Sequence, residues 1–135
     1  MLLLAYCTMS PPPPLKPVEW MGSALDDLRE CPEAVQDEVG YAIHLAQLGE
    51  HPPGAKRLRG ELAGVIELVV DYDRDTYRAV YTVKLQDVVY VLHVFQKKSK
   101  RGIATPRHDI ALIKDRYRWA RAHYVEHYAA EQENR

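Results

Sequence analysis

A chain of 135 residues is long enough to bury one hydrophobic core, so the sequence predicts a single domain. Apolar residues make up 47% of the chain and charged residues 27%, which is ordinary for a globular protein and excludes disorder throughout. The net charge of −1 conceals an asymmetry, because residues 1–50 carry two basic and eight acidic side chains, whereas residues 56–135 carry sixteen basic and eleven acidic ones. This division indicates a basic working surface on the C-terminal part of the chain, which suits a nucleic-acid-binding face.

The N-terminal region is not expected to belong to the core. Residues 1–5 are apolar but too few to span a membrane, and they lack the basic start of a signal peptide. Residues 1–14 end in four prolines and should form a disordered tail or lie upstream of the true translation start. The expected domain covers residues 15–128, followed by a tail at 129–135. Cys7 and Cys31 form neither a disulfide framework nor a metal-ligand spacing, which indicates a reducing cytoplasm.

The first elements are a strand at 15–20 and two helices. Ser23 is a candidate N-cap for a short helix that ends near residue 30, where Cys31 and Pro32 interrupt it. Pro32 opens a second helix, and Gly49 is a natural stop. Its apolar residues recur on one face, which predicts packing against a sheet: Val35, Val39, Ala42, Ile43 and Ala46. The two helices are expected to form an αα-hairpin.

The second half of the chain predicts three strands and one helix. Residues 50–64 are expected to be a loop, and strands follow at about 65–71, 76–85 and 88–96. Their short polar connections predict an antiparallel meander. Thr105 and Pro106 open a final helix, whose apolar stripe should face the sheet while Arg116 and the other basic residues lie elsewhere around it. The predicted order is β-α-α-β-β-β-α, an α+β domain whose antiparallel sheet is backed by the hairpin and the C-terminal helix.

The stretch VVYVLHVFQKKSKRG at 88–102 joins an apolar strand to a basic turn. Seven apolar residues among eight are typical of a central strand that is covered on both faces. Lys97, Lys98, Lys100 and Arg101 crowd the end of this strand, a position where loops on a rigid sheet often carry functional side chains. The alternative is a solvated, positively charged loop.

Several stretches resemble the RelE/ParE superfamily of type II toxins, specifically its HigB-like, phage-related Gp49-like branch. They are KPVEWMGSALDDL, GAKRLRGELAGVIEL, TYRAVYTVKL and VYVLHVFQKKSKRGIATP, and the resemblance covers roughly residues 16–120. It implies a RelE-like fold and a cytoplasmic endoribonuclease that cleaves mRNA, often on the ribosome, without a metal or another cofactor. It also implies neutralisation by a cognate helix-turn-helix antitoxin.

The resemblance assigns roles to basic side chains, because RNA supplies its own 2′-OH nucleophile and the protein needs mainly to stabilise the phosphorane. Arg78 matches an arginine expected to hold the scissile phosphate, although a structural ion pair with Glu67 is an alternative. Lys97 and Lys98 match a basic pair after the last strand, and Lys98 is expected to stabilise the transition state. Further RNA contacts are expected from Lys56, Arg57, Arg59, Lys100 and Arg101, with an ordinary solvated loop as the alternative for the first three.

The chain departs from the family pattern in ways that leave the acid and the base unassigned. It has Glu67 and Val69 where the nuclease relatives have lysines, and Ile103-Ala104-Thr105 where they have a tyrosine. His93 is the first candidate because its ordinary pKa lies near neutrality, and a packed strand histidine is the alternative. Tyr90, Glu67 and His108 are weaker candidates for proton transfer. A metal site at His123 and His127 is disfavoured because no glutamate follows in a metallopeptidase pattern and the two residues lie near the end of the predicted helix.

Two other functions stay open at this point. One is a ParE-like toxin that inhibits a protein such as DNA gyrase and performs no chemistry. The other is a degenerate phage-derived domain that has kept the fold without activity. No membrane partner is expected.

Overall fold

The computed structural model describes residues 14–97 and 106–129 of the chain. Its elements are β1 (Val18–Trp20), α2 (Ala24–Arg29), α3 (Glu33–Gln47), β2 (Ala55–Arg57), the 3₁₀ turn η1 (Gly60–Leu62), β3 (Val65–Tyr72), β4 (Asp75–Thr82), β5 (Val89–Lys97), α4 (Arg107–Tyr124) and the π-helical turn η2 (Val125–Ala129). The predicted α+β class and the predicted order of elements are confirmed, with β2 as an addition. The predicted tails and the predicted N-cap Thr105 lie outside the described residues, apart from Pro14 and Ala129.

The sheet has the strand order β1-β5-β4-β3-β2. Strands β3, β4 and β5 form the predicted antiparallel meander. The prediction of a wholly antiparallel sheet is wrong, because β1 pairs in parallel with β5, with Val18 beside Val89 and Trp20 beside Val91. A parallel neighbour needs a long connection rather than a hairpin turn, and the chain between β1 and β5, which contains α2, α3 and strands β2 to β4, provides one.

The prediction of a loop throughout residues 50–64 is also wrong. Ala55–Arg57 forms β2 and pairs antiparallel with β3, which places Lys56 opposite Glu67 and Arg57 opposite Ile66. Gly60–Leu62 then forms the 3₁₀ turn. A strand of three residues is too short to display an alternating pattern, so the sequence gives no periodic signal for it.

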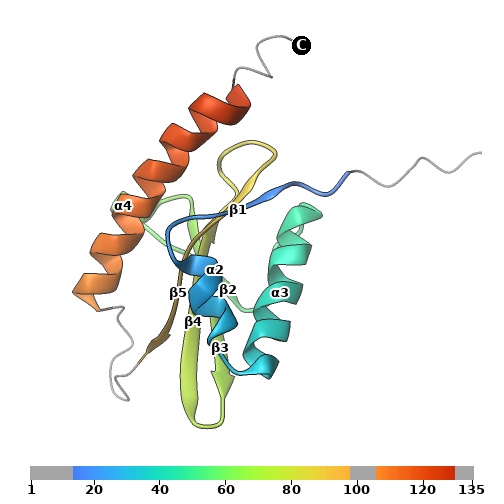
Figure 1. The fold of residues 1–135 in the computed structure, drawn as a ribbon, viewed down its shortest axis with the longest axis vertical. Helices are drawn as coiled ribbons and strands as arrows, with labels where there is room; N and C mark the ends of the chain where they lie inside the picture. Colours follow the sequence, from blue (N-terminus) through green and yellow to red (C-terminus); the bar gives the residue numbers. More distant parts are fainter. Residues whose placement is uncertain (1–13, 98–105, 130–135) are drawn as a thin grey trace, which may run out of the picture.

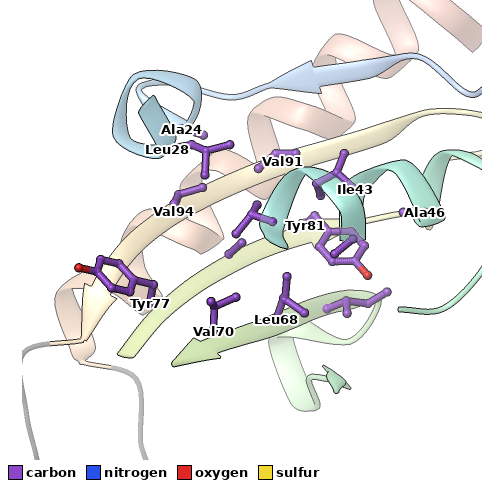
Figure 2. Packing of buried hydrophobic residues seen from close by; sticks show 14 of the residues in the cluster. Ala24, Leu28, Ile43, Ala46, Leu68, Val70, Tyr77, Tyr81, Val91 and Val94 are labelled. Carbon is purple, nitrogen blue, oxygen red and sulfur yellow. The ribbon is translucent and has the colours of Figure 1, made fainter. Parts of the chain in front are cut away.

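Helices α2 and α3 cover one face of the sheet, and Figure 1 shows α4 on the opposite side. All five members of the predicted α3 stripe are buried. They pack with Ala24 and Leu28 of α2 against the strands, including Tyr81 and Val91 (Figure 2). The helical period of the apolar residues therefore identified the buried face of α3 correctly.

Helix α4 packs along β5 and forms the second half of the core. Ile113, Tyr117 and Ala120 are buried as predicted. Arg116 was expected away from the sheet, and that prediction is wrong, because only 6% of this residue is exposed. Among the described residues, no helix is both long enough and apolar enough to cross a membrane.

Candidate functional site

Four strands contribute charged side chains to the sheet face on which α4 packs. Successive strand residues point to opposite faces, so Glu67 shares the face of Val65, and Arg78 shares that of Val80. Val65 and Val80 both belong to the core beneath α4. Cross-strand pairing adds Lys56, opposite Glu67, and Lys97, opposite Thr76. We call Lys56, Glu67, Arg78 and Lys97 the charged sheet face.

Glu67 and Arg78 form a buried ion pair at the centre of this face. The Arg78 Nη1 atom donates to Glu67 Oε1 over 2.6 Å, and the two side chains are 9% and 5% exposed, respectively. A buried guanidinium requires such a partner, because an uncompensated charge away from water is costly. The pair is the structural alternative foreseen for Arg78, and it also fixes the guanidinium beside Lys97.

Lys97 ends β5 and is 8% exposed. Burial is the main cause that lowers the pKa of its ammonium group, and the positive charges of Arg78 and Lys56 lower it further, while Glu67 acts in the opposite direction. The four charged groups are therefore close enough to influence one another. Three cations against one carboxylate give this face a net positive charge, which favours an anion such as a phosphate.

His93 is held by side chains on both sides of its ring. The His93 Nε2 atom lies 2.8 Å from Asp109 Oδ1, and Nδ1 lies 3.2 Å from Arg116 Nη1. A guanidinium can only donate, so Nδ1 must accept and Nε2–H must donate to Asp109. Burial is the main cause that lowers the pKa of His93, although Asp109 opposes it. In this neutral, doubly engaged form neither ring nitrogen is available to a substrate, and a catalytic role for His93 stays a prediction.

A register shift in β5 explains where His93 points. Val80 pairs with His93 whereas Tyr81 pairs with Val91, so Leu92 is an extra residue in β5. Such a bulge places Leu92 and His93 on the same side, toward α4. In this register His93 shares its face with Phe95 and Lys97, whereas Val91 faces the opposite core.

Arg116 is a buried polar residue that sequence reasoning missed. Its Nη1 atom donates to the carbonyl oxygen of Leu92 over 3.0 Å, and Nη2 donates to Ser23 Oγ over 3.0 Å. Ser23 Oγ in turn donates to Asp27 Oδ2 over 2.7 Å. The available signal was its position, since Arg116 falls at the helical spacing of the apolar stripe, three residues after Ile113.

The structure separates the other basic residues predicted to bind RNA. Lys56 belongs to the charged sheet face, whereas Arg57 points to the opposite face because it is the next residue of the same strand. Arg59 is exposed directly before η1. Lys98, Lys100 and Arg101 lie outside the described residues.

The weaker candidates for proton transfer also lie in different places. Glu67 belongs to the charged sheet face. Tyr90 is buried, with its hydroxyl 2.8 Å from Nδ1 of His123, and burial raises the pKa of this tyrosine. His108 is exposed in the first turn of α4. Within residues 14–97 and 106–129, no three His, Cys, Asp or Glu side chains are grouped so that they could hold a metal ion.

Comparison with known proteins identifies the family. The family model described as Phage derived protein Gp49-like (DUF891) matches residues 26–118, which is more than half of the chain. The chain belongs to the Gp49-like family. This family is part of the RelE toxin superfamily, so the resemblance inferred from the sequence is confirmed at that level.

Two further comparisons of this Gp49-like protein were with solved structures and with curated proteins. The crystal structure of the toxin–antitoxin complex RelBE2 from Mycobacterium tuberculosis contains a similar chain, with 24% identity and a TM-score of 0.45. The similarity covers 62% of the Gp49-like chain and 100% of that chain. No curated protein matches the sequence.

Proposed function

We propose that this Gp49-like protein is the toxin of a type II toxin–antitoxin system and a metal-independent endoribonuclease of the cytoplasm. Its substrate is mRNA, including mRNA bound to the ribosome, and its natural partner is a helix-turn-helix antitoxin encoded next to it. The observation that supports this proposal is the charged sheet face, where Lys56, Arg78 and Lys97 gather around one carboxylate. Family membership is consistent with it.

The proposed reaction is attack of a ribose 2′-oxygen on the adjacent phosphorus, with departure of the 5′-oxygen of the next nucleotide. The products are a 2′,3′-cyclic phosphate and a 5′-hydroxyl end. Arg78 and Lys97 neutralise the charge that accumulates on the phosphorane oxygens. Permanent or buried cations aimed at a phosphate suit this role, because they require no reorganisation during the reaction.

The proton transfers follow from which groups share this face. Glu67 accepts the proton of the 2′-hydroxyl, because it is the carboxylate of the charged sheet face and its Oε1 atom is held in place by Arg78. Lys97 donates a proton to the departing 5′-oxygen, which its lowered pKa makes easier than for an ordinary lysine. Lys98, which is expected from the sequence to stabilise the transition state, lies outside the described residues and stays a prediction for that role.

Mapping RNA 5′ ends after induced expression tests this function. The wild type should produce new ends with 5′-hydroxyl groups, and the Lys97→Ala and Lys98→Ala variants should produce far fewer of them. Arg118→Ala is the matched control, since Arg118 is exposed on α4 and pairs with Asp115 rather than facing the sheet. Co-expression with the helix-turn-helix protein of the adjacent gene should suppress the ends.

A ParE-like inhibitor of a protein target is the second candidate function. The observation that favours it is the buried Glu67–Arg78 pair, which occupies a place where the nuclease relatives carry lysine, and such a pair can be purely structural. Growth arrest without new RNA ends would support this candidate and refute the nuclease proposal. Cell growth without arrest would indicate a fold that has lost activity.

Binding to RNA offers an independent check. Contacts between lysine or arginine and phosphate release counterions, so the affinity for RNA should fall steeply as salt is added. The wild type and Lys56→Gln should differ in the slope of log affinity against log salt, with a shallower slope for the variant. An affinity that does not respond to salt would contradict a basic RNA-binding face.

A further inference from the structure

A small pocket opens on the face of the sheet opposite the charged sheet face. Its volume is about 80 Å³, and it lies between the C-terminal end of α3 and strands β2, β3 and β4. The polar side chains that line it are those of Lys16, Glu50, His51, Arg57 and Tyr81. None of them has a role in the proposed RNA cleavage, although Arg57 was one of the basic residues that the sequence singled out.

The hydroxyl group of Tyr81 is the feature of this pocket that requires explanation. Tyr81 is 0% exposed, and its hydroxyl is among the buried polar atoms that have no hydrogen-bond partner. Figure 2 shows its ring under α3 among the apolar side chains of the core. Burial raises the pKa of Tyr81 to about 12, so at neutral pH the group is an O–H donor without an acceptor. Buried donors in folded proteins are nearly always satisfied, which points to an acceptor that enters the pocket.

The nearby charges indicate that this acceptor is an anion. Arg57, Ile66 and Tyr81 form one row across β2, β3 and β4, because Arg57 pairs with Ile66 and Ile66 pairs with Tyr81. The positive charge of Arg57 partly opposes the rise in the pKa of Tyr81, so the guanidinium lies within electrostatic reach of the hydroxyl. Lys16 supplies a second cation.

The negative charge in the pocket is smaller than the positive charge. Glu50 is the one carboxylate among its lining residues, so Lys16 and Arg57 leave a net positive charge when His51 is neutral. The backbone of Lys16 is held in place, since its N–H donates to Gln47 O over 3.2 Å and Gln47 Nε2 donates to Lys16 O over 2.7 Å. The backbone that carries this cation is therefore fixed beside the pocket.

We propose that this pocket binds a carboxylate group, either of a small acid or of an Asp or Glu side chain in a partner protein. A carboxylate accepts several hydrogen bonds, so it can take the Tyr81 O–H and the Arg57 guanidinium together. A cavity measured in this way needs about 10–15 Å³ to hold one water molecule, so a pocket of about 80 Å³ has room for a carboxylate. Because the site lies on the other face of the sheet, it stands independently of RNA cleavage.

Tyrosine-selective ¹³C NMR tests this proposal. The ring-carbon resonance next to the hydroxyl of Tyr81 is assigned by its loss in Tyr81→Phe, and the full chain is titrated with acetate at constant ionic strength. The expected result is a saturable shift of this resonance. Its affinity should fall at least tenfold in Arg57→Gln and stay unchanged in Arg59→Gln, a matched arginine that does not line the pocket.

Three results would overturn the proposal. The absence of a saturable shift with either acetate or inorganic phosphate would mean that the pocket holds only water. A shift with phosphate alone would rule out a carboxylate, and an equal acetate affinity in Arg57→Gln would remove Arg57 from the site. A blocked Gly-Asp-Gly peptide distinguishes the sources, since binding tighter than that of acetate favours a partner's side chain, and weaker binding favours a small acid.

Discussion

Replacing one member of the Glu67–Arg78 pair should destabilise the fold far more than replacing both. Each single replacement leaves an uncompensated charge in a place where the side chains are only 5% and 9% exposed. Removing one partner of a buried pair typically costs about 3–5 kcal/mol, whereas apolar replacement of both partners is often close to neutral. We therefore compare Glu67→Leu and Arg78→Met with the variant that carries both changes.

Thermal unfolding can resolve a loss of folding free energy of this size. In a domain of this size 1 kcal/mol corresponds to a shift in Tm of about 3–4 °C, so each single variant should melt about 9–20 °C below the wild type. The double variant should lie much nearer to the wild type. Urea unfolding followed by circular dichroism gives the same comparison as free energies, and the coupling between the two changes is read from the cycle.

Simple additivity of the two single effects would refute the reasoning, since it would mean that the two charges do not compensate one another. The double variant also separates the two roles considered for Arg78. If it is folded and still produces new RNA ends, the pair is structural and Arg78 does not hold the phosphate. If it is folded but produces none, the charges of this face take part in the reaction.

Three further predictions concern Lys97, His93 and Gly22. The rate of RNA cleavage should decline at alkaline pH, and this decline should begin below the ordinary lysine pKa of 10.5. The reason is that Lys97 must be protonated to act and its pKa is lowered. A pH–rate profile measures this decline. The free energy of unfolding should fall as the pH drops through 6.5, because the folded state disfavours protonation of His93 and the unfolded state does not; urea titrations from pH 8 to 5.5 measure this. Gly22→Ala should destabilise the fold by about 1 kcal/mol or more, since φ is +56° and the added Cβ would lie 2.7 Å from Arg116 Nε; thermal unfolding measures this.

Each of these predictions has its own control. The alkaline decline should be absent from the residual activity of Lys97→Ala, and an unchanged profile would exclude Lys97 as the proton donor. The loss of stability near pH 6.5 should be smaller in His93→Gln than in the wild type. Gly40→Ala is the comparison for Gly22, because a Cβ at Gly40 meets nothing within 4 Å. Equal stability of the two alanine variants would contradict the close contact with Arg116.

Sequence periodicity predicted the long elements well because their patterns extend over several turns. The α3 stripe from Val35 to Ala46 repeats at helical spacing, and every member is buried. The polar connections between β3, β4 and β5 predicted their order and direction. These signals are local, so one sequence is sufficient to reveal them.

The features that the sequence did not predict depend on non-local pairing or on one buried polar group. Strand β2 is three residues long, and the parallel partnership of β1 depends on where the intervening helices return the chain. Arg116 was expected on the surface because arginine is rarely buried without a partner, and its partners lie on β5 and beside α2. Helical spacing places Arg116 beside the apolar stripe of α4, but neither spacing nor propensity shows which groups on β5 and beside α2 it contacts.

The candidate site also combines features that the sequence predicts with features that it does not. The ion pair between Glu67 and Arg78 could be foreseen, since both lie on predicted neighbouring strands and a buried arginine needs a carboxylate. The separation of Lys56 from Arg57 could not, because adjacent residues face opposite sides only if they belong to a strand. The sequence therefore grouped residues that the sheet divides between two surfaces.

The polar network around His93 has a consequence for the charged sheet face. Asp109 and Arg116 hold the His93 ring from α4, and Arg116 also binds the carbonyl oxygen of Leu92. These contacts attach the middle of β5 to α4, and Lys97 lies four residues farther along the same strand. A change at Arg116 should therefore displace Lys97 although Arg116 does not contact the proposed substrate. Arg116→Lys keeps the charge but loses the forked geometry, so it should lower the RNA cleavage rate more than it weakens RNA binding.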